Sequence, residues 1–276
     1  PSSEQCVDKP KALKPAPRKR PWPRPNPPKR TYRSLMNSRV ILVSDDRSSL
    51  RSPDTLLWPD AACMRGIHTG EWTAHIFEYT MSFEGNMTQV RELAAANGVG
   101  VLHPHGALAT DPPGLIVCDV DSTVTRTEAI DLLAECAGKA DEVREITARA
   151  MVGELDFTQS LYARIRCLEG LHIGALEEAW KATVITPGTA ELVAAAHDVG
   201  AAVGLVSGGF TAVVDPLAEQ IGADFAASNE LEIVDNHLTG RVVGDIIDRA
   251  AKATWLRRWA SERGVALERT IALGDG

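Results

Sequence analysis

The sequence predicts an α/β fold with three layers, in which helices cover both faces of a mostly parallel sheet. Three short apolar runs indicate its buried core strands, at residues 114–118, 202–206 and 270–273. Helical patterns separate these runs, as expected for strand–helix–strand units. Each run ends in small or acidic residues, at the strand end where open α/β sheets bind their ligands.

The chain before residue 111 predicts two different parts. Residues 1–33 carry ten Lys/Arg against two acids, a net charge of +8, together with nine prolines. Such a composition cannot bury a core, so we expect residues 1–35 to form a disordered tail. One interpretation is a basic tail that is attracted to RNA or membranes. The other is an extension upstream of the true start of the protein, which is favoured because ordered-looking sequence begins at Met36.

Residues 36–110 predict a small α+β region whose role no motif identifies. Residues 40–43 are apolar and indicate a strand, and residues 71–81 alternate weakly and indicate another. Residues 87–96 read as a short helix that is closed by Asn97 and a glycine.

Residues 111–276 predict the main domain, which begins with the strand at 114–118. Four helices are expected after this strand, within about residues 126–185, at 128–137, 140–152, 157–168 and 175–182. Helices that cover the sheet are expected at 187–199, 210–221 and 248–263. Thr186 and Pro187 suit the N-cap and first position of the first of these. A further short strand at 225–227 and a hairpin at 231–243, with Asp-Asn-His at its turn, complete the prediction.

Two acids follow the first core strand directly. Asp119 and Asp121 lie two residues apart, so on an extended backbone they share a side. Two carboxylates at one point repel unless a cation or a proton intervenes, which predicts a Mg²⁺ site with one Asp free to attack phosphorus. Asp, Ser and Thr are also ordinary turn residues, so a plain turn stays the alternative for this segment taken alone.

Three later segments carry residue types that suit a phosphate group. Ser207–Gly209 follows the second strand and precedes a helix, a geometry that binds anions through backbone N–H groups and a hydroxyl. Lys252 lies on an amphipathic helix, and Asp275 follows the third strand between two glycines. Each has a plain alternative when taken alone, such as a loop or a solvated helix face. Together they favour a site for phosphoryl transfer.

In this order, the motifs resemble the haloacid dehalogenase-like (HAD) phosphatase superfamily, which opens with D-x-D-S/T-T and closes with G-D-G-x-N-D. Glu128 and the block from Ala150 to Arg164 are similar to the serine-selective cap of the phosphoserine phosphatase family within it. The resemblance covers about residues 112–276. It implies a Rossmann-like core with a helical cap inserted after the first core strand.

The resemblance also implies a role for each matching residue. Asp119 would be the nucleophile that forms an aspartyl-phosphate, and Asp121 would act as general acid and then as general base. Mg²⁺ would be held by Asp119, the main-chain carbonyl of Asp121, and Asp275. The substrate would be O-phospho-L-serine, whose hydrolysis to L-serine and phosphate is the last step of L-serine biosynthesis. The residues implied to contact it are Ser207, Gly208 and Lys252 at the phosphoryl group, Glu128 at the ammonium, Arg164 at the carboxylate, and Met151 and Phe157 over the pocket.

The end of the chain departs from the family pattern. The family motif continues beyond Gly276 with an Asn and an Asp, which are not in this sequence. We therefore expect a C-terminally truncated fragment that folds poorly or has negligible activity. Two other functions stay open, a phosphatase of this fold for another small phosphomonoester, such as phosphohomoserine or a sugar phosphate, and a binding protein without activity.

Composition limits the partners. Subtracting the +8 of residues 1–33 from the net charge of −8 leaves −16 for residues 34–276, which argues against nucleic-acid binding by the folded part. The five cysteines show no CxxC spacing and predict reduced, buried thiols in a cytoplasmic protein. No apolar run approaches the length of a membrane span. The expected partner is a small-molecule substrate, and a homodimer is compatible with the sequence.

Overall fold

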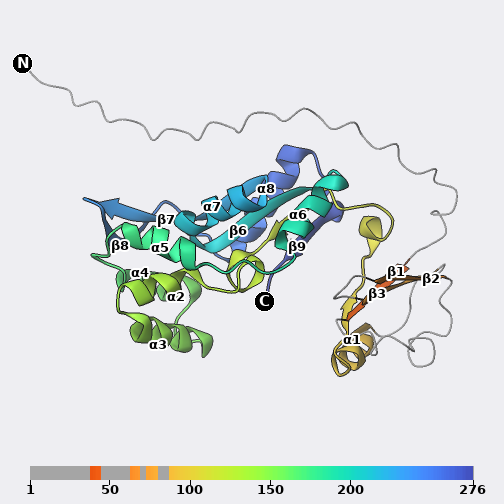
Figure 1. Cartoon of the computed structure of the whole chain (residues 1–276), viewed down its shortest axis with the longest axis horizontal. Helices are drawn as coiled ribbons and strands as arrows, with labels where there is room; N and C mark the ends of the chain where they lie inside the picture. The colour runs from red at the N-terminus through yellow and green to blue at the C-terminus, as the bar shows by residue number, and fades with distance from the viewer. Residues whose placement is uncertain (1–37, 45–62, 69–72, 80–86, 276) are drawn as a thin grey trace, which may run out of the picture. The chain divides into compact units, whose positions relative to one another are not determined.

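The structure is a computed structural model, and it describes residues 38–44, 63–68, 73–79 and 87–275 (Figure 1). The predicted tail at residues 1–35 lies outside these residues, and so do the ends of the predicted strand at 71–81.

The described residues before 111 form a four-stranded antiparallel sheet, in the order β2-β3-β1-β4, with one helix. Its elements are β1 (Ser38–Ser44), β2 (Cys63–His68), β3 (Thr73–Tyr79), α1 (Met87–Ala95), β4 (Gly100–Leu102) and the short turn η2 (Gly106–Ala109). The predicted strands and helix correspond to β1, β3 and α1. The sequence did not reveal β2, which lacks regular alternation, or β4, which has three residues.

A five-stranded sheet in the order β8-β7-β6-β5-β9 forms the core of the following domain. Its strands are β5 (Leu115–Cys118), β6 (Ala202–Phe210), β7 (Phe225–Val234), β8 (His237–Val243) and β9 (Thr270–Leu273). Neighbouring strands run parallel except for β8, which is antiparallel to β7. Because β5 pairs with both β6 and β9, all four of its residues are buried, as the apolar run predicted.

Helices cover both faces of this sheet, which confirms the three-layer α/β prediction (Figure 1). On one face, α6 (Thr189–Asp198) and α7 (Thr211–Ile221) pack on side chains such as Ile116. On the other face, α8 (Arg249–Arg263) packs on Val117. The two faces receive alternate residues of β5 because successive strand side chains point to opposite sides.

Four helices lie between β5 and α6 in the chain, namely α2 (Ala129–Cys136), α3 (Ala140–Met151), α4 (Phe157–Arg166) and α5 (Gly174–Ala182). They share an apolar core that includes Leu133, Leu161 and Ile165. The segments that enter and leave this cap are joined, since the Arg126 amide donates to the Val184 carbonyl at 2.8 Å. The cap therefore starts and ends at one place beside the sheet.

The β7–β8 hairpin also holds the cap. The Leu238 amide donates to the Leu171 carbonyl at 2.8 Å, and the Gly170 amide donates to the Leu238 carbonyl at 2.8 Å. Asp235 and Asn236 form the turn with φ values of 50° and 63°, a left-handed pair typical of two-residue hairpins. β7 thus runs without a break from the core sheet to the cap, where the sequence predicted a short strand at 225–227 separate from the first strand of the hairpin at 231–243.

One predicted helix start was wrong. The helix expected from Pro187 begins at Thr189, with Gly188 as its N-cap at φ 90°. The Thr186 hydroxyl, expected to cap it, donates instead to the Thr123 carbonyl at 2.8 Å. The strand expected at 202–206 is longer than predicted, because Ser207–Gly209 continues β6, and the helix expected at 210–221 is α7.

Gly204 in β6 leaves room for the Trp259 indole of α8, which is 3% exposed. A Cβ at Gly204 would lie 2.6 Å from Cζ3 of Trp259, closer than real contacts allow. We therefore expect Gly204→Ala to lower the free energy of unfolding by about 1–3 kcal/mol, measured by urea denaturation. The penalty should shrink in a Trp259→Leu background, and an equal penalty in both backgrounds would contradict this explanation.

Candidate active site

Asp119 is fixed at the carboxyl edge of the sheet by backbone groups. It follows β5 and caps the tight turn η3 (Val120–Val124), where its Oδ1 accepts from the Val120 amide at 2.8 Å. Its own amide donates to the Leu273 carbonyl at the end of β9, also at 2.8 Å. The turn is not a regular helix, because Ser122 has a φ of 56°. The carboxylate of Asp119 is thereby held beyond the strand, close to the ends of two neighbouring strands.

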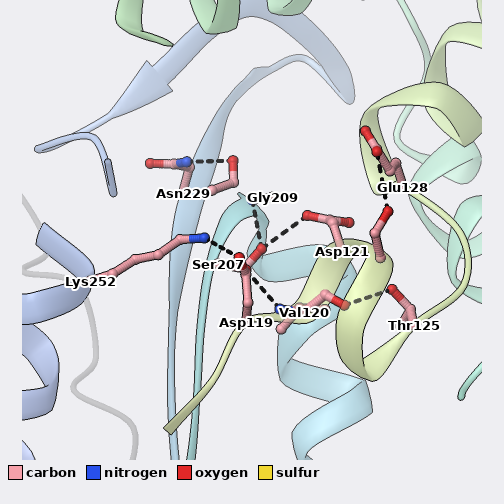
Figure 2. A network of polar contacts seen from close by, with 11 residues as sticks. Asp119, Val120, Asp121, Thr125, Glu128, Ser207, Gly209, Asn229 and Lys252 are labelled. Carbon is pink, nitrogen blue, oxygen red and sulfur yellow. Dashed lines mark hydrogen bonds and ion pairs between the residues drawn. The ribbon is translucent and has the colours of Figure 1, made fainter. Parts of the chain in front are cut away.

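Lys252 reaches the same carboxylate from α8. Its Nζ donates to Oδ2 of Asp119 at 2.5 Å, across 133 positions of the chain (Figure 2). Asp248 starts α8 as its N-cap, with Oδ1 accepting from the Ala251 amide at 2.7 Å. The side chains of Lys252 and Asp119 remain 30% and 20% exposed, so the ion pair stays within reach of a ligand.

Asp121 is the more enclosed of the two acids. Its Oδ1 accepts from the Ala129 amide at 3.0 Å, at the start of α2, and its Oδ2 accepts from the Ser207 hydroxyl at 3.1 Å. Burial raises the pKa of Asp121, and the charge of Asp119 adds to this, while the hydrogen bonds and Lys252 oppose it. Burial therefore favours the protonated form of Asp121.

Two glycines let the end of β6 approach Asp121 and the cap. Ser207 is fully buried, and its Oγ accepts from the Gly209 amide at 2.7 Å. A Cβ at Gly209 would lie 2.7 Å from Oδ2 of Asp121, and a Cβ at Gly208 would lie 2.9 Å from Cζ of Phe157. Gly209 belongs to the predicted anion-binding segment Ser207–Gly209, but its approach to Asp121 was not predicted.

The cap contributes an acid and a base. Glu128 directly precedes α2, and its Oε1 accepts from the Ser122 hydroxyl at 3.3 Å (Figure 2). Burial raises the pKa of Glu128, and the negative charges of Asp131 and Asp121 add to this. Burial also lowers the pKa of Arg164 on α4, whereas nearby carboxylates, that of Glu128 first, oppose the shift. The two side chains are therefore close enough to interact electrostatically.

The structure separates the two apolar residues predicted to close the pocket. Phe157 at the start of α4 lies over Gly208, so the cap touches the end of β6 there. Met151 ends α3 and is 84% exposed, so it is not packed over the pocket as Phe157 is.

Asp119 and the segment that carries Asp275 approach each other near the end of β9. Asp275 follows this strand and is exposed, and a Cβ on the adjacent Gly274 would lie 3.7 Å from Cβ of Asp119. Within the described ranges, no three His, Cys, Asp or Glu side chains group closely enough to hold a metal ion. The predicted set needs only two carboxylates and the Asp121 carbonyl, which are the hard oxygen donors that Mg²⁺ prefers, so the residue types fit.

Asn229 belongs to the site although the sequence analysis missed it. It lies in β7, is 2% exposed, and its Nδ2 donates to the Gly208 carbonyl at 2.8 Å (Figure 2). Its Oδ1 accepts from the Ile247 amide at 2.9 Å. No local signal pointed to this residue, because Asn229 falls between the predicted strand at 225–227 and the predicted hairpin at 231–243, where Asn is an ordinary turn residue.

Cys118, the thiol next to Asp119, does not have the character of the nucleophile used by thiol-dependent phosphatases. Cys118 directly precedes Asp119, and burial raises the pKa of its thiol to about 11, with the Asp119 charge adding to the shift. A thiol with such a pKa stays protonated near neutral pH. Cys118, Cys136 and Cys167 are free thiols as predicted, but only Cys118 is buried, since Cys136 is exposed and Cys167 is half-buried.

Comparison with known proteins places this geometry among hydrolases. Residues 116–276 match the family model described as haloacid dehalogenase-like hydrolase. A phosphoserine phosphatase from Streptomyces coelicolor is 50% identical over 183 residues, which are 66% of this chain and 45% of that protein. A phosphoserine phosphatase from Streptococcus thermophilus is 48% identical over 163 residues, which are 59% of this chain and 76% of that protein. The chain thus spans less than half the length of the Streptomyces relative.

Comparison with solved structures also finds a phosphoserine phosphatase. A probable phosphoserine phosphatase from Vibrio cholerae, solved in its unliganded form, has a TM-score of 0.69 and 33% sequence identity, covering 87% of this chain and 73% of that one. Separately, no helix in the ranges that the structure describes has the length and apolar character needed to cross a membrane.

Proposed function

The chain belongs to the haloacid dehalogenase-like hydrolase family, and we propose that it is a phosphoserine phosphatase that hydrolyses O-phospho-L-serine to L-serine and phosphate. The observation that supports this most is the convergence of two acids, a serine and a lysine at one edge of the sheet. Lys252 lies 2.5 Å from Asp119, and Ser207 lies 3.1 Å from Asp121, although each pair is far apart in sequence.

In the first step, an oxygen of Asp119 attacks phosphorus and the bond to the seryl oxygen breaks. The Val120 amide and Lys252 fix the direction of this carboxylate, which lowers the entropic cost of the attack. Lys252, the Ser207 hydroxyl and the Gly208 amide are the donors that would neutralise charge on the phosphoryl oxygens.

Asp121 serves both halves of the reaction. The departing seryl oxygen needs a proton, and burial favours the protonated form of Asp121. After this transfer, the same carboxylate can take a proton from the water that hydrolyses the aspartyl-phosphate. Its anchoring by the Ala129 amide and the Ser207 hydroxyl keeps it at one position for both transfers.

The proposed metal is Mg²⁺, held by Asp119, the Asp121 carbonyl and Asp275. When bound, it would supply positive charge against the transferring phosphoryl group.

The cap is proposed to select the substrate. Glu128 lies among other carboxylates, and a substrate ammonium would relieve their mutual repulsion. Arg164 can bind the substrate carboxylate through two parallel hydrogen bonds. Phe157 lies over Gly208, where it would keep water from the bound amino acid.

The test compares phosphoserine with O-phosphoethanolamine, which lacks only the carboxylate. We expect Arg164→Ala to lower kcat/KM for phosphoserine by roughly 10- to 150-fold, the equivalent of one charge-assisted contact, and to leave phosphoethanolamine nearly unchanged. Arg166→Ala is the matched control, because Arg166 lies on the same helix and is exposed. It should change neither substrate.

Equal losses for both substrates would refute the role of Arg164. A sugar phosphate that turns over faster than phosphoserine, without dependence on Arg164, would instead support the alternative of another small phosphomonoester.

A further inference from the structure

Asn229 is placed where the backbone pairing of the core sheet is interrupted. β6 and β7 pair in register from Gly204 to Val206, and the register then shifts before Phe210 pairs with Asn229. The interruption covers Ser207–Gly209, the segment that carries the proposed phosphoryl donors. The Asn229 side chain donates to the Gly208 carbonyl at 2.8 Å and so supplies a hydrogen bond inside this gap.

The orientation of the Asn229 amide is fixed by its partners. A carbonyl oxygen can only accept and a backbone amide can only donate, so Nδ2 must face Gly208 and Oδ1 must face Ile247. The side chain is 2% exposed, so water does not compete at either end. Asn229 therefore joins the end of β6 to the residues just before α8, the helix that carries Lys252.

A directed series of hydrogen bonds runs from Asn229 to the acid. The Gly208 carbonyl and the Gly209 amide belong to one peptide group. The carbonyl accepts from Asn229, and the amide donates to Oγ of Ser207 at 2.7 Å. The Ser207 hydroxyl then donates to Asp121 at 3.1 Å. Each bond polarises the next in the same direction, an arrangement in which hydrogen bonds strengthen one another.

We propose that Asn229 is a positioning residue for phosphoryl transfer. It fixes the Gly208–Gly209 peptide, and through it the Ser207 hydroxyl and the Gly208 amide, and it holds this segment at a set distance from α8 and Lys252. The inference rests on the proposed function of the same site. It adds a residue that lies outside the substrate-contacting set and controls the geometry of that set.

The test uses two substitutions of similar size. Asn229→Leu removes both hydrogen bonds, and Asn229→Asp keeps the acceptor for Ile247 but places an oxygen against the Gly208 carbonyl. For both variants we expect kcat for phosphoserine to fall on the order of 10- to 100-fold, as for a misplaced reacting group, and inhibition by inorganic phosphate to weaken. The preference for phosphoserine over phosphoethanolamine should stay unchanged, because the carboxylate contact lies at the other end of the substrate.

Two control variants separate positioning from stability. Ser228→Ala changes the neighbouring residue of β7, whose buried hydroxyl has no hydrogen-bond partner among the described residues. Val193→Ala removes buried volume from α6, a helix that carries none of the proposed site residues. Thermal melting gives the folded fraction of each variant. The controls should keep kcat per folded enzyme and phosphate inhibition near the wild-type values.

The outcomes are distinguishable. Asn229 variants with wild-type kcat per folded enzyme and wild-type phosphate inhibition would overturn the positioning role, even if they melt earlier. A wild-type protein that turns over no phosphomonoester would count against the proposed function instead. In that case the affinity for inorganic phosphate, measured by calorimetry, still decides the inference, since Asn229→Leu should weaken it and Val193→Ala should not.

Discussion

Replacing Asp119 by asparagine is expected to abolish turnover of every phosphomonoester. The amide has nearly the same size, and its single oxygen can still accept from the Val120 amide, although its NH₂ group cannot accept from Lys252, so the fold of the site should be kept. It cannot attack phosphorus as a carboxylate does, and we expect kcat to fall by roughly 10³-fold or more. Stopped-assay phosphate release, with thermal melting to confirm folding, measures this loss.

The nucleophile can also be observed directly. Beryllium fluoride with Mg²⁺ mimics a phosphoryl group on a carboxylate, so it should bind the wild type and not Asp119→Asn. Asp198→Asn serves as the matched control, because Asp198 is exposed at the end of α6. Near-normal turnover by Asp119→Asn, or beryllium fluoride bound equally by both proteins, would end the assignment of Asp119 as nucleophile.

The sequence was sufficient to predict the sheet and its catalytic edge for one physical reason. Runs such as residues 115–118 must be buried on both faces, and a parallel strand buried in this way loses the polar alternation of a surface strand. Parallel strands also bring their carboxyl ends to the same edge. Asp119 and Ser207 therefore had to be close in space once their strands were recognised, whatever their separation in sequence.

The roles of Asn229 and Gly209 could not be predicted in this way, because they depend on contacts between distant segments. Asn229 matters only because the β6–β7 register shifts beside it. Gly209 must lack a side chain because Asp121, which lies far away in sequence, occupies the space. Neither the register shift between β6 and β7 nor the close approach of Asp121 to Gly209 leaves a local pattern in the sequence.

The wrong prediction of a helix start at Pro187 also has its cause in a contact between distant segments. Thr186 and Pro187 carry a strong local signal for a helix N-terminus. The Thr186 hydroxyl is used instead to join the exit of the cap to the Thr123 carbonyl, and the helix starts after Gly188. A tertiary hydrogen bond thus overrides a local propensity worth about 1 kcal/mol.

The second large effect is expected at Asp121. Asp121→Asn removes a group that donates and then accepts a proton, and general acid–base groups contribute about 10²- to 10⁴-fold. The loss with phosphoserine should fall in this range, because a seryl alkoxide is a poor leaving group without a proton. The amide oxygen can still accept from the Ala129 amide, and the amide NH₂ can donate to the Ser207 hydroxyl oxygen, so melting should change little.

A good leaving group separates the two proton transfers. p-Nitrophenolate departs without a proton, so Asp121→Asn should still form the aspartyl-phosphate from p-nitrophenyl phosphate. Its hydrolysis then lacks a base, and we expect a burst of one p-nitrophenolate per enzyme followed by slow turnover. Acid quenching should trap labelled phosphate on Asp121→Asn and none on the Asp119→Asn, Asp121→Asn double variant. Steady turnover without a burst, with the same fractional loss of activity for phosphoserine and p-nitrophenyl phosphate, would show that Asp121 only shapes the site. A residue that transfers protons must slow phosphoserine more strongly, because the seryl leaving group needs a proton and p-nitrophenolate does not.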